Sequence, residues 1–430
     1  MRSQALWISA ILAVSAPAGA GMKIDHWIAQ SGARVNFVES HALPIVDVAV
    51  QFAAGSAYDS REQAGLARLA LAMLKAGSSR YSETEASRRI ADAGAQLREN
   101  FDLDRAGFAL RSLSSEAERK AATQTLADML QAPLFPAEAF EREKARAIAN
   151  AREAETQPDR VAERRLYALM YPAHPYGFSE TPDTLASIKR EDVERHYRNC
   201  FGSARAVVTI VGDLDRDAAK ALAEELTSRL SKGTDPALAP VATPAGATLR
   251  VAHPSTQSHV LLGVAAVSRS DPDYFPLFVG NYSLGGGGFR SRLLREVREK
   301  RGYAYSAYSY FRPYEREGPF LVGLETRRDQ AREALELARS VVGEFVKHGP
   351  TEAELKAAKK GLVGSFPLRI DTNRKILEQI AAIGFYKLPL EWLDEFPARV
   401  EAVTLAQVRS AFAKRIDPEK LSIVVVGAPD

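Results

Sequence analysis

The chain has 430 residues, of which 46% are hydrophobic and 26% charged, a balance typical of folded globular proteins and not of disordered ones. Its 57 basic and 54 acidic side chains leave a net charge of +3, which is too small to indicate nucleic acid as a partner. A chain of this length exceeds what one ordinary hydrophobic core supports, so we expect about two to four domains.

The first twenty residues differ in character from the rest of the chain. Arg2 supplies a short positive region, residues 5–14 (ALWISAILAV) are apolar, and residues 18–20 (AGA) offer a small-residue cleavage site. The apolar stretch is shorter than the roughly 20 residues that a membrane-spanning helix needs. We therefore predict a removable export signal at residues 1–20, a periplasmic or otherwise exported chain, and no membrane span once the signal is removed. An uncleaved anchor is the alternative.

The predicted elements of the first half mix strands and helices. Residues 35–38 and 45–52 have the composition of strands, and 206–211 (AVVTIV) that of a short buried strand. A strand pair is predicted at 96–113. Helical patterns cover 64–75, 83–94, 115–130, 136–155, 160–170 and 190–199.

The end of the chain repeats an earlier segment. Residues 188–212 and 403–427 align without a gap at one offset, since 403 − 188 and 427 − 212 both equal 215. Apolar residues of the two copies coincide, and both copies end in a buried strand followed by glycine. The chain is therefore predicted to be a tandem duplication.

A linker separates the two predicted copies. Residues 231–248 are rich in Pro, Gly, Ala and Thr, which is the composition of a flexible connection. We assign the first domain to residues 21–230 and the second to residues 249–430. Because strands and helices do not alternate regularly in either half, the α+β class is favoured over a doubly wound parallel sheet.

Residues 284–310 (LGGGGFRSRLLREVREKRGYAYSAYSY) form the most distinctive stretch. Four consecutive glycines, at 285–288, allow close backbone approach or positive φ at little cost. Apolar residues at helical spacing then predict an amphipathic helix over 289–300, which Gly302 would end. Residues 303–310 are rich in tyrosine and predict a strand.

The glycines do not match a nucleotide site, because neither Gly-x-Gly-x-x-Gly with a following acid nor Gly-Lys-Ser/Thr is present. A hinge or a close backbone approach fits them better. Arg298 and Tyr305 stand seven residues apart, and both donate hydrogen bonds, which would suit a peptide carbonyl or a developing oxyanion. By spacing alone, Arg298 is equally consistent with an ordinary solvated side chain.

Other catalytic groups are not indicated by local motifs. No two histidines stand at the i, i+4 spacing that would place both on one helix face. There is no Gly-x-Ser-x-Gly elbow, and the single cysteine, Cys200, lies beside Phe201 in an apolar setting typical of a core residue. The histidines are His26, His41, His174, His196, His253, His259 and His348.

The duplicated halves, the glycine run and the segment REKRGYAY (298–305) together resemble the M16 family of zinc metallopeptidases, which includes pitrilysin, insulin-degrading and mitochondrial processing peptidases. The resemblance covers nearly the whole chain after residue 20. It implies two domains similar to those of LuxS and the mitochondrial processing peptidases, each with a mixed, mainly antiparallel sheet covered by helices.

The resemblance also locates a metal site that this chain lacks. Active members carry His-x-x-Glu-His on the first long helix and a glutamate ligand on a later helix. At the matching positions this chain has Arg68 and Ala72 for the histidines, Leu71 for the general base and Asn150 for the third ligand, although Glu143 is kept. Arginine and alanine do not replace imidazole at zinc, so no metal is expected in this chain.

What the chain keeps is the family's Arg/Tyr pair, at Arg298 and Tyr305. The resemblance implies a subunit that pairs with a zinc-bearing His-x-x-Glu-His chain, binds a peptide or unfolded protein, and serves a metalloendopeptidase without being active alone. Gly286, Gly287, Gly288 and Phe289 are assigned to substrate binding. The alternatives are an inactive homologue that binds peptides or aids assembly, and an independent hydrolase with an unrecognised site.

Overall fold

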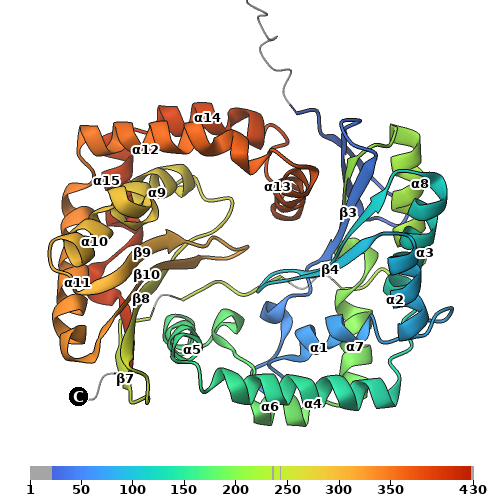
Figure 1. Ribbon diagram of the computed structural model, residues 1–430, viewed down its shortest axis with the longest axis horizontal. Coiled ribbons are helices and arrows are strands. Elements are labelled where there is room, and N and C mark those ends of the chain that lie inside the picture. The colour runs from blue at the N-terminus through green and yellow to red at the C-terminus, as the bar shows by residue number, and fades with distance from the viewer. Residues whose placement is uncertain (1–21, 235–236, 243, 428–430) are drawn as a thin grey trace, which may run out of the picture.

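The computed structural model describes residues 22–234, 237–242 and 244–427, so the predicted export signal lies outside the described residues. Two sheets, each with its own helices, form the two halves of the molecule (Figure 1). The first half contains strands β1 (Asp25–Ile28), β2 (Arg34–Glu39), β3 (Ile45–Phe52), β4 (Gln96–Phe101), β5 (Ala106–Leu113) and β6 (Ala206–Gly212). Its helices are α1 (Leu66–Met73), α2 (Glu83–Asp92), α3 (Glu116–Gln131), α4 (Ala137–Ala154), α5 (Pro158–Met170), α6 (Pro182–Ser187), α7 (Arg190–Cys200) and α8 (Arg216–Thr227).

The second half has the same kinds of elements. Its strands are β7 (Thr248–Val251), β8 (Gln257–Val267), β9 (Ala304–Phe311), β10 (Gly318–Arg327) and β11 (Ser422–Val426). Its helices are α9 (Tyr274–Asn281), α10 (Arg292–Leu294), α11 (Ala331–His348), α12 (Glu352–Ser365), α13 (Asn373–Tyr386), α14 (Trp392–Ala402) and α15 (Leu405–Arg415).

The two sheets share one topology. The strand order is β1-β2-β6-β3-β5-β4 in the first and β7-β11-β8-β10-β9 in the second, so the last five strands of the first order correspond one to one with the second. In each sheet a single pair is parallel, β2 with β6 and β7 with β11, and the other pairs are antiparallel. The predicted α+β fold, with two mixed and mainly antiparallel sheets, is confirmed.

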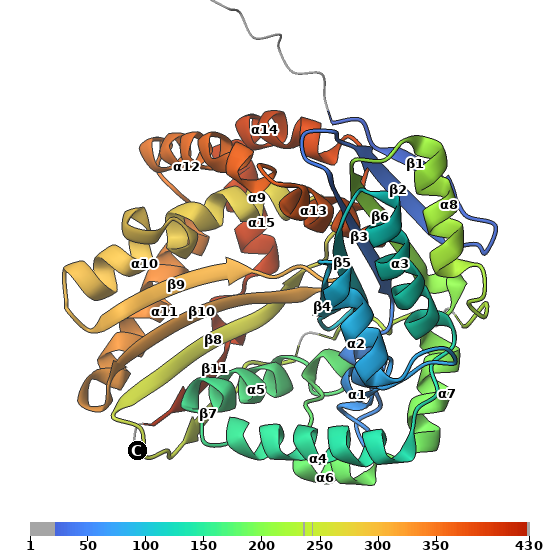
Figure 2. The ribbon, with the colours of Figure 1, turned by 45° about the vertical axis from the view of Figure 1, so that its right-hand side comes forward.

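One helix from each half packs against the sheet of the other half. Helix α5 packs on β8 and β11, and helix α13 packs on β6 and β3 (Figure 2). The two helices begin at Pro158 and Asn373, which are 215 positions apart, the same offset as in the sequence repeat. The exchange buries apolar side chains of α5 against the second sheet, with Leu166 and Leu261 in one cluster. Apolar burial therefore joins the halves as well as filling each one.

A buried carboxylate adds a polar link at the junction. Asp104, in the turn between β4 and β5, is fully buried and accepts hydrogen bonds from the hydroxyls of Tyr176 (2.7 Å) and Tyr386 (2.9 Å) and from the backbone N–H of Glu315 (2.7 Å). Tyr386 and Glu315 belong to the second half. Burial raises the pKa of Asp104 to about 6. The three donors satisfy the carboxylate and tie the two halves together.

Most predicted elements lie where the sequence placed them, but the segment after the glycine run is different. The predicted helix over 289–300 is wrong as a regular helix: a 3-10 turn at Gly288–Arg290 is followed by the three-residue α10 and a π-helical turn at Arg295–Glu299. The cause is Ser291, whose extended backbone (ψ 150°) interrupts the helix and whose hydroxyl caps α10 by accepting from the Leu294 N–H. Gly302 does end the segment, with φ of +65°.

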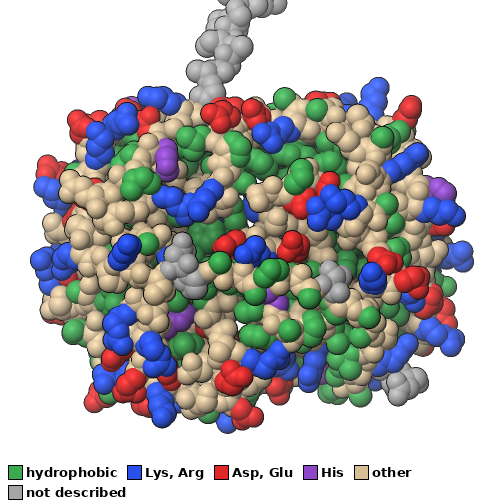
Figure 3. Space-filling view, turned by 180° about the vertical axis from the view of Figure 1, so that it is seen from behind, with side chains coloured by type: hydrophobic (Ala, Val, Ile, Leu, Met, Phe, Trp, Pro, Cys, Tyr) green, Lys and Arg blue, Asp and Glu red, His purple; other side chains and the backbone are tan. Residues whose placement is uncertain are grey.

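The distribution of charged and apolar side chains is that of an ordinary globular fold. On the face seen from behind, Lys and Arg side chains are interspersed with Asp and Glu, so this face does not carry charge of one sign (Figure 3). Within residues 22–234, 237–242 and 244–427, none of the helices combines the length and the apolar character that crossing a membrane requires. Cys200 is buried, and burial raises the pKa of its thiol to about 11, as expected for a core residue.

Candidate functional site

The glycine run is seated against strand β9. A methyl group on Gly285 would overlap the backbone nitrogen and hydroxyl of Ser309, and one on Gly286 would lie 2.8 Å from the amide nitrogen of Asn281. Asn281 and Ser309 are themselves joined by two hydrogen bonds, of 2.9 and 2.6 Å. The predicted close backbone approach is therefore present. Only Gly288, with φ of +60°, needs the left-handed backbone that glycine permits.

Three side chains lie together beside the glycine run: Phe289 and Tyr305 are exposed, and Arg298 is partly buried. The guanidinium carbon of Arg298 lies 4.7 Å from the ring centre of Tyr305 and 5.4 Å from that of Phe289. Tyr305 is 77% exposed and Phe289 is 70% exposed. No other described residue forms a hydrogen bond or ion pair with the Arg298 guanidinium or the Tyr305 hydroxyl. Both donors are therefore held near each other, by cation–π contact, yet remain available to another molecule.

A β-bulge directs Tyr305 outward. On the neighbouring strand β10, Glu325 pairs with Ser306 and Thr326 pairs with Ala304, so Tyr305 has no partner in the ladder. An extra residue of this kind bends the strand locally and changes where a side chain points. Strand β9 is also the edge of its sheet, so nothing in that sheet covers Tyr305 from the side.

Contacts of α10 with neighbouring elements hold the segment that carries Arg298 in place. The guanidinium of Arg292 makes two hydrogen bonds to the Glu354 carboxylate, of 2.8 and 2.5 Å, and a third to the Gly349 carbonyl. Together with the capping hydrogen bonds of Thr351, the Arg292 pair lowers the pKa of Glu354 to about 2, although burial acts in the opposite direction. The ionic pair therefore anchors α10 to α12 at ordinary pH.

The positions equated with metal ligands lie in the first half, on α1 and α4. Arg68 is exposed, stacks on the Phe101 ring at 4.2 Å and pairs with Glu180 at 3.8 Å. Leu71 is 1% exposed and belongs to the core, and Ala72 is partly buried. Asn150 is exposed on α4. None of these side chains offers an imidazole or a carboxylate, and no group of three or more His, Cys, Asp or Glu able to hold a metal occurs among the described residues.

The retained acid on α4 has a structural role. Glu143 is 8% exposed and pairs with Arg146 at 2.7 Å and with Arg142 at 3.3 Å, so its carboxylate is already occupied. The N-terminus of α1 is capped by the buried Asp59, whose carboxylate accepts from the N–H groups of Gly65 (2.9 Å) and Ala67 (2.8 Å). Burial raises the pKa of Asp59 to about 7.

Two adjoining cavities lie along the β4 edge between the halves. One, of about 460 Å³, is bounded by β3, β4 and β5 of the first half and by α13 of the second. The other, of about 330 Å³, extends from Arg68 on α1 to Tyr314 of the second half. Both are lined by Phe101, Asp102 and Arg312, so the two cavities adjoin at these residues.

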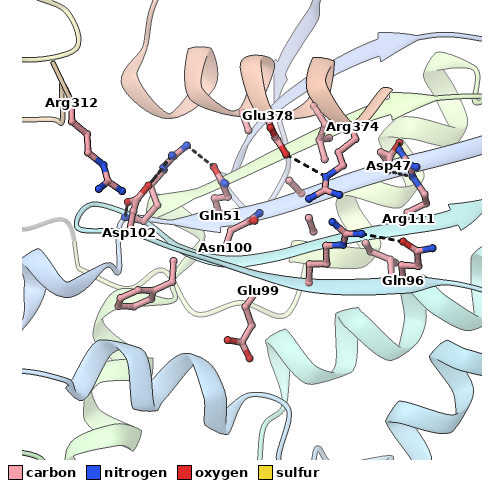
Figure 4. A pocket seen from close by; sticks show the side chains of 18 residues that line it. Asp47, Gln51, Gln96, Glu99, Asn100, Asp102, Arg111, Arg312, Arg374 and Glu378 are labelled. Carbon is pink, nitrogen blue, oxygen red and sulfur yellow. Dashed lines mark hydrogen bonds and ion pairs between the residues drawn. The ribbon is translucent and has the colours of Figure 1, made fainter. Parts of the chain in front are cut away.

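Most residues that line the larger cavity are polar, and some of them pair with one another. Arg374 and Glu378 point down from α13 toward the strands, and Arg312 enters from the second half (Figure 4). On the sheet, the Asp47 carboxylate receives two hydrogen bonds from Arg111, of 2.8 and 2.9 Å, and raises the pKa of that guanidinium. Backbone and side chains of an extended peptide would find both donors and acceptors here.

The structure brings some predicted site residues together and separates others. Arg298, Tyr305, Phe289 and the glycines form one group in the second half, while Arg68, Leu71, Ala72 and Asn150 lie on α1 and α4 in the other half. Neither Arg298 nor Tyr305 lines the cavity that Arg68 lines. One chain therefore does not assemble the pair over its own degenerate metal positions. The cavity residues Asp102 and Arg312 could not be predicted from the sequence, because their role depends on how α13 and α5 cross between the halves.

Comparisons with known proteins define the family. Residues 34–180 match the family model described as Insulinase (Peptidase family M16), and residues 187–362 match the model described as Peptidase M16 inactive domain. A crystal structure of a peptidase M16 inactive domain from Pseudomonas fluorescens is 34% identical in sequence and superimposes with a TM-score of 0.91. The match covers 95% of this chain and 98% of that one. The chain belongs to the M16 peptidase family.

Individual relatives carry differing names. A protein of Helicobacter pylori named "Non-peptidase homolog YmxG" is 25% identical over 93% of both chains. The "Mitochondrial-processing peptidase subunit beta" of Blastocladiella emersonii is 24% identical over 92% of this chain and 87% of its own length. An "Uncharacterized zinc protease" of Streptomyces coelicolor is 31% identical, but the match covers 57% of this chain and 55% of that protein.

Proposed function

We propose that this chain is the non-zinc subunit of an exported, heterodimeric M16 metallopeptidase, and that it supplies Arg298 and Tyr305 to an active site completed by a zinc-bearing partner chain. The supporting observation is the contrast between two sets of residues. The four positions equated with the metal site hold no ligand or base. In contrast, the partly buried Arg298 stacks on the exposed Tyr305, and neither side chain forms a hydrogen bond to another described residue. A site used only within this chain would not leave both donors without a partner and away from the metal positions.

The chemistry follows from the two donors. Tyr305 donates a hydrogen bond to the carbonyl oxygen of the scissile peptide bond, and this bond strengthens as negative charge develops on that oxygen. Arg298 holds the substrate backbone and keeps the Tyr305 ring in place by stacking on it. Gly286, Gly287, Gly288 and Phe289 lie beside the pair and bind the peptide. The zinc ion and the glutamate that activates water belong to the partner.

The proposal names a partner and a location. The partner is an M16 chain with the His-x-x-Glu-His motif, which fits the description of one relative as a subunit of a processing peptidase. The substrate is a peptide or an unfolded protein, for which the two adjoining cavities between the halves offer space. Export rests on the predicted signal at residues 1–20 and is tested by N-terminal sequencing of the mature protein.

The test is Tyr305→Phe in the reconstituted pair. Loss of one oxyanion donor lowers kcat by on the order of 10²-fold, while pairing of the two chains stays unchanged because only a hydroxyl is removed. Tyr308→Phe is the matched control, since Tyr308 lies on the same strand, is 39% exposed and stacks on Tyr310 without contacting Arg298. Full activity of Tyr305→Phe would refute the assigned role.

The second candidate is an inactive M16 homologue that captures peptides or aids assembly. The cavities of about 460 and 330 Å³ and the name "non-peptidase homolog" of one relative favour it. Under this alternative the chain binds peptide without a partner, and Arg374→Ala in the larger cavity weakens that binding while Tyr305→Phe does not. The opposite pattern, with loss only in Tyr305→Phe of the pair, supports the heterodimer.

A further inference from the structure

A third cavity, of about 410 Å³, lies at the junction of the two halves and away from the glycine run. The first half contributes Arg34 on β2, Tyr58 and Arg205. The second half contributes Arg269, which follows β8, and Lys387, which follows α13. Neither the peptidase chemistry nor the peptide cavities use these residues. The cavity therefore needs an explanation of its own.

Arg205 is the unusual residue in this cavity. Its side chain is 2% exposed, yet Nε, Nη1 and Nη2 all lack a hydrogen-bond partner among the described residues. The guanidinium lies over the Tyr58 ring, with its carbon 4.1 Å from the ring centre. Stacking engages the flat face of the guanidinium but none of its five N–H donors. A buried charge without a partner is strongly disfavoured, so an anion at this place would remove a large penalty.

The surroundings of Arg205 are also basic. Arg269 has a buried Nε without a partner and lies over the Tyr274 ring at 5.3 Å. Arg34 donates to the Gly384 carbonyl at 3.0 Å, and Lys387 is exposed at the cavity rim. The single carboxylate among the described lining residues is Glu315, which accepts a hydrogen bond from the Tyr58 hydroxyl at 3.4 Å. Apart from Arg34, three cations thus face one carboxylate among the described lining residues.

We propose that this cavity binds a small anion through a phosphate group, which Arg205 and Tyr58 of one half and Arg269 and Lys387 of the other hold in common. Guanidinium N–H groups in a fixed fork match the oxygens of phosphate, and two forks approach the cavity from different halves. The volume is within the range of small-molecule sites and exceeds what a single water needs. Because the ligand contacts both halves, its binding stabilises their closed arrangement.

The test measures thermal unfolding and calorimetric binding of the full chain. Inorganic phosphate, pyrophosphate and glycerol 3-phosphate are each compared with sodium chloride and with succinate at equal ionic strength. We expect the phosphate compounds to raise the unfolding midpoint beyond the chloride reference. Inorganic phosphate acting as strongly as the organic ester would identify the free ion as the ligand, and a stronger ester would identify a phosphomonoester. An equal response to succinate, or none beyond chloride, would overturn the proposal.

Arg205→Met distinguishes a binding role from a structural one. If Arg205 awaits an anion, the variant unfolds at a higher temperature in chloride, because an unpaired buried charge is removed, and its phosphate affinity falls at least about tenfold. A structural Arg205 would instead give a lower midpoint with the phosphate response unchanged. Arg332→Met is the matched control, since Arg332 is 79% exposed on α11, and it leaves both readouts unchanged.

One further variant tests the contribution of the second half. Lys387→Met changes an exposed residue of that half without touching a buried side chain, and it weakens phosphate binding about two- to fivefold. Retained affinity in this variant would contradict a site shared by both halves.

Discussion

The link between the two halves gives a prediction whose size follows from the structure. Tyr386→Phe removes the hydroxyl that donates to Asp104 at 2.9 Å across the junction. Asp104 keeps two donors, the Tyr176 hydroxyl and the Glu315 N–H, and stays buried. A hydrogen bond to a charged acceptor contributes about 1.5–3 kcal/mol, so opening of the junction becomes roughly 10- to 100-fold more frequent in the variant.

The effect depends on pH in a direction set by the raised pKa of Asp104. A carboxyl whose pKa is about 6 in the folded chain and about 4 when unfolded holds its proton more tightly in the folded state. Its contribution to stability is therefore complete below about pH 4 and is lost as pH rises through about 6, by about 3 kcal/mol in total. Tyr386 donates to the charged form, so its removal raises the pKa further and costs most at neutral pH.

The assay is amide hydrogen exchange at Glu315, whose N–H donates directly to Asp104 at 2.7 Å. Variant and parent are compared at the same pH, and we expect their exchange ratio to fall between pH 7.5 and 4.5. Tyr197→Phe is the control, because its hydroxyl donates to the Leu130 carbonyl within the first half and does not reach the junction. Equal Glu315 exchange in parent and Tyr386→Phe at pH 7.5 would refute the reasoning.

Two further variants test the site positions. Gly285→Ala introduces a methyl group that overlaps Ser309, so we expect the free energy of unfolding in denaturant to fall by about 1–3 kcal/mol. Gly343→Ala in α11 is the control, because the added methyl group meets nothing within 4 Å and the free energy of unfolding should rise by about 0.5–1 kcal/mol. Equal effects of the two variants would contradict the close approach. The triple variant Arg68→His, Ala72→His, Asn150→Glu should retain close to one zinc per chain after dialysis, and the double variant without Asn150→Glu should retain less. Zinc content equal to that of the parent would show that these positions are not the ligand positions.

The strands of the first half other than β1, and most of its helices, could be predicted from the sequence because their apolar residues repeat at the period of the element. The same rule was wrong over 289–300, since the short α10 buries Leu293 and the π-helical turn after it buries Val297 as well as a regular helix does. Periodicity also does not say which sheet a helix covers. The crossing of α5 and α13 between the halves could therefore not be predicted from periodicity, and neither could the junction and its cavities.

The candidate site was predictable in part. Spacing placed Arg298 and Tyr305 near each other, and the structure brings them into contact, but the bulge that exposes Tyr305 depends on pairing with β10. Asp104 and Arg205 gave no signal, because burial of a single polar residue leaves no periodic trace in the sequence. Their partners are more than 50 positions away in the chain, at Tyr386 and Tyr58.

The most direct measurement is hydrolysis of an internally quenched peptide by this chain alone, by a zinc-bearing His-x-x-Glu-His M16 chain from the same organism, and by their equimolar mixture. A shared active site predicts no cleavage by this chain, little by the zinc chain, and a rate in the mixture well above the sum of the two, lost on chelation of zinc. A mixture no faster than the zinc chain alone would contradict the account and leave this protein a binding relative of the family.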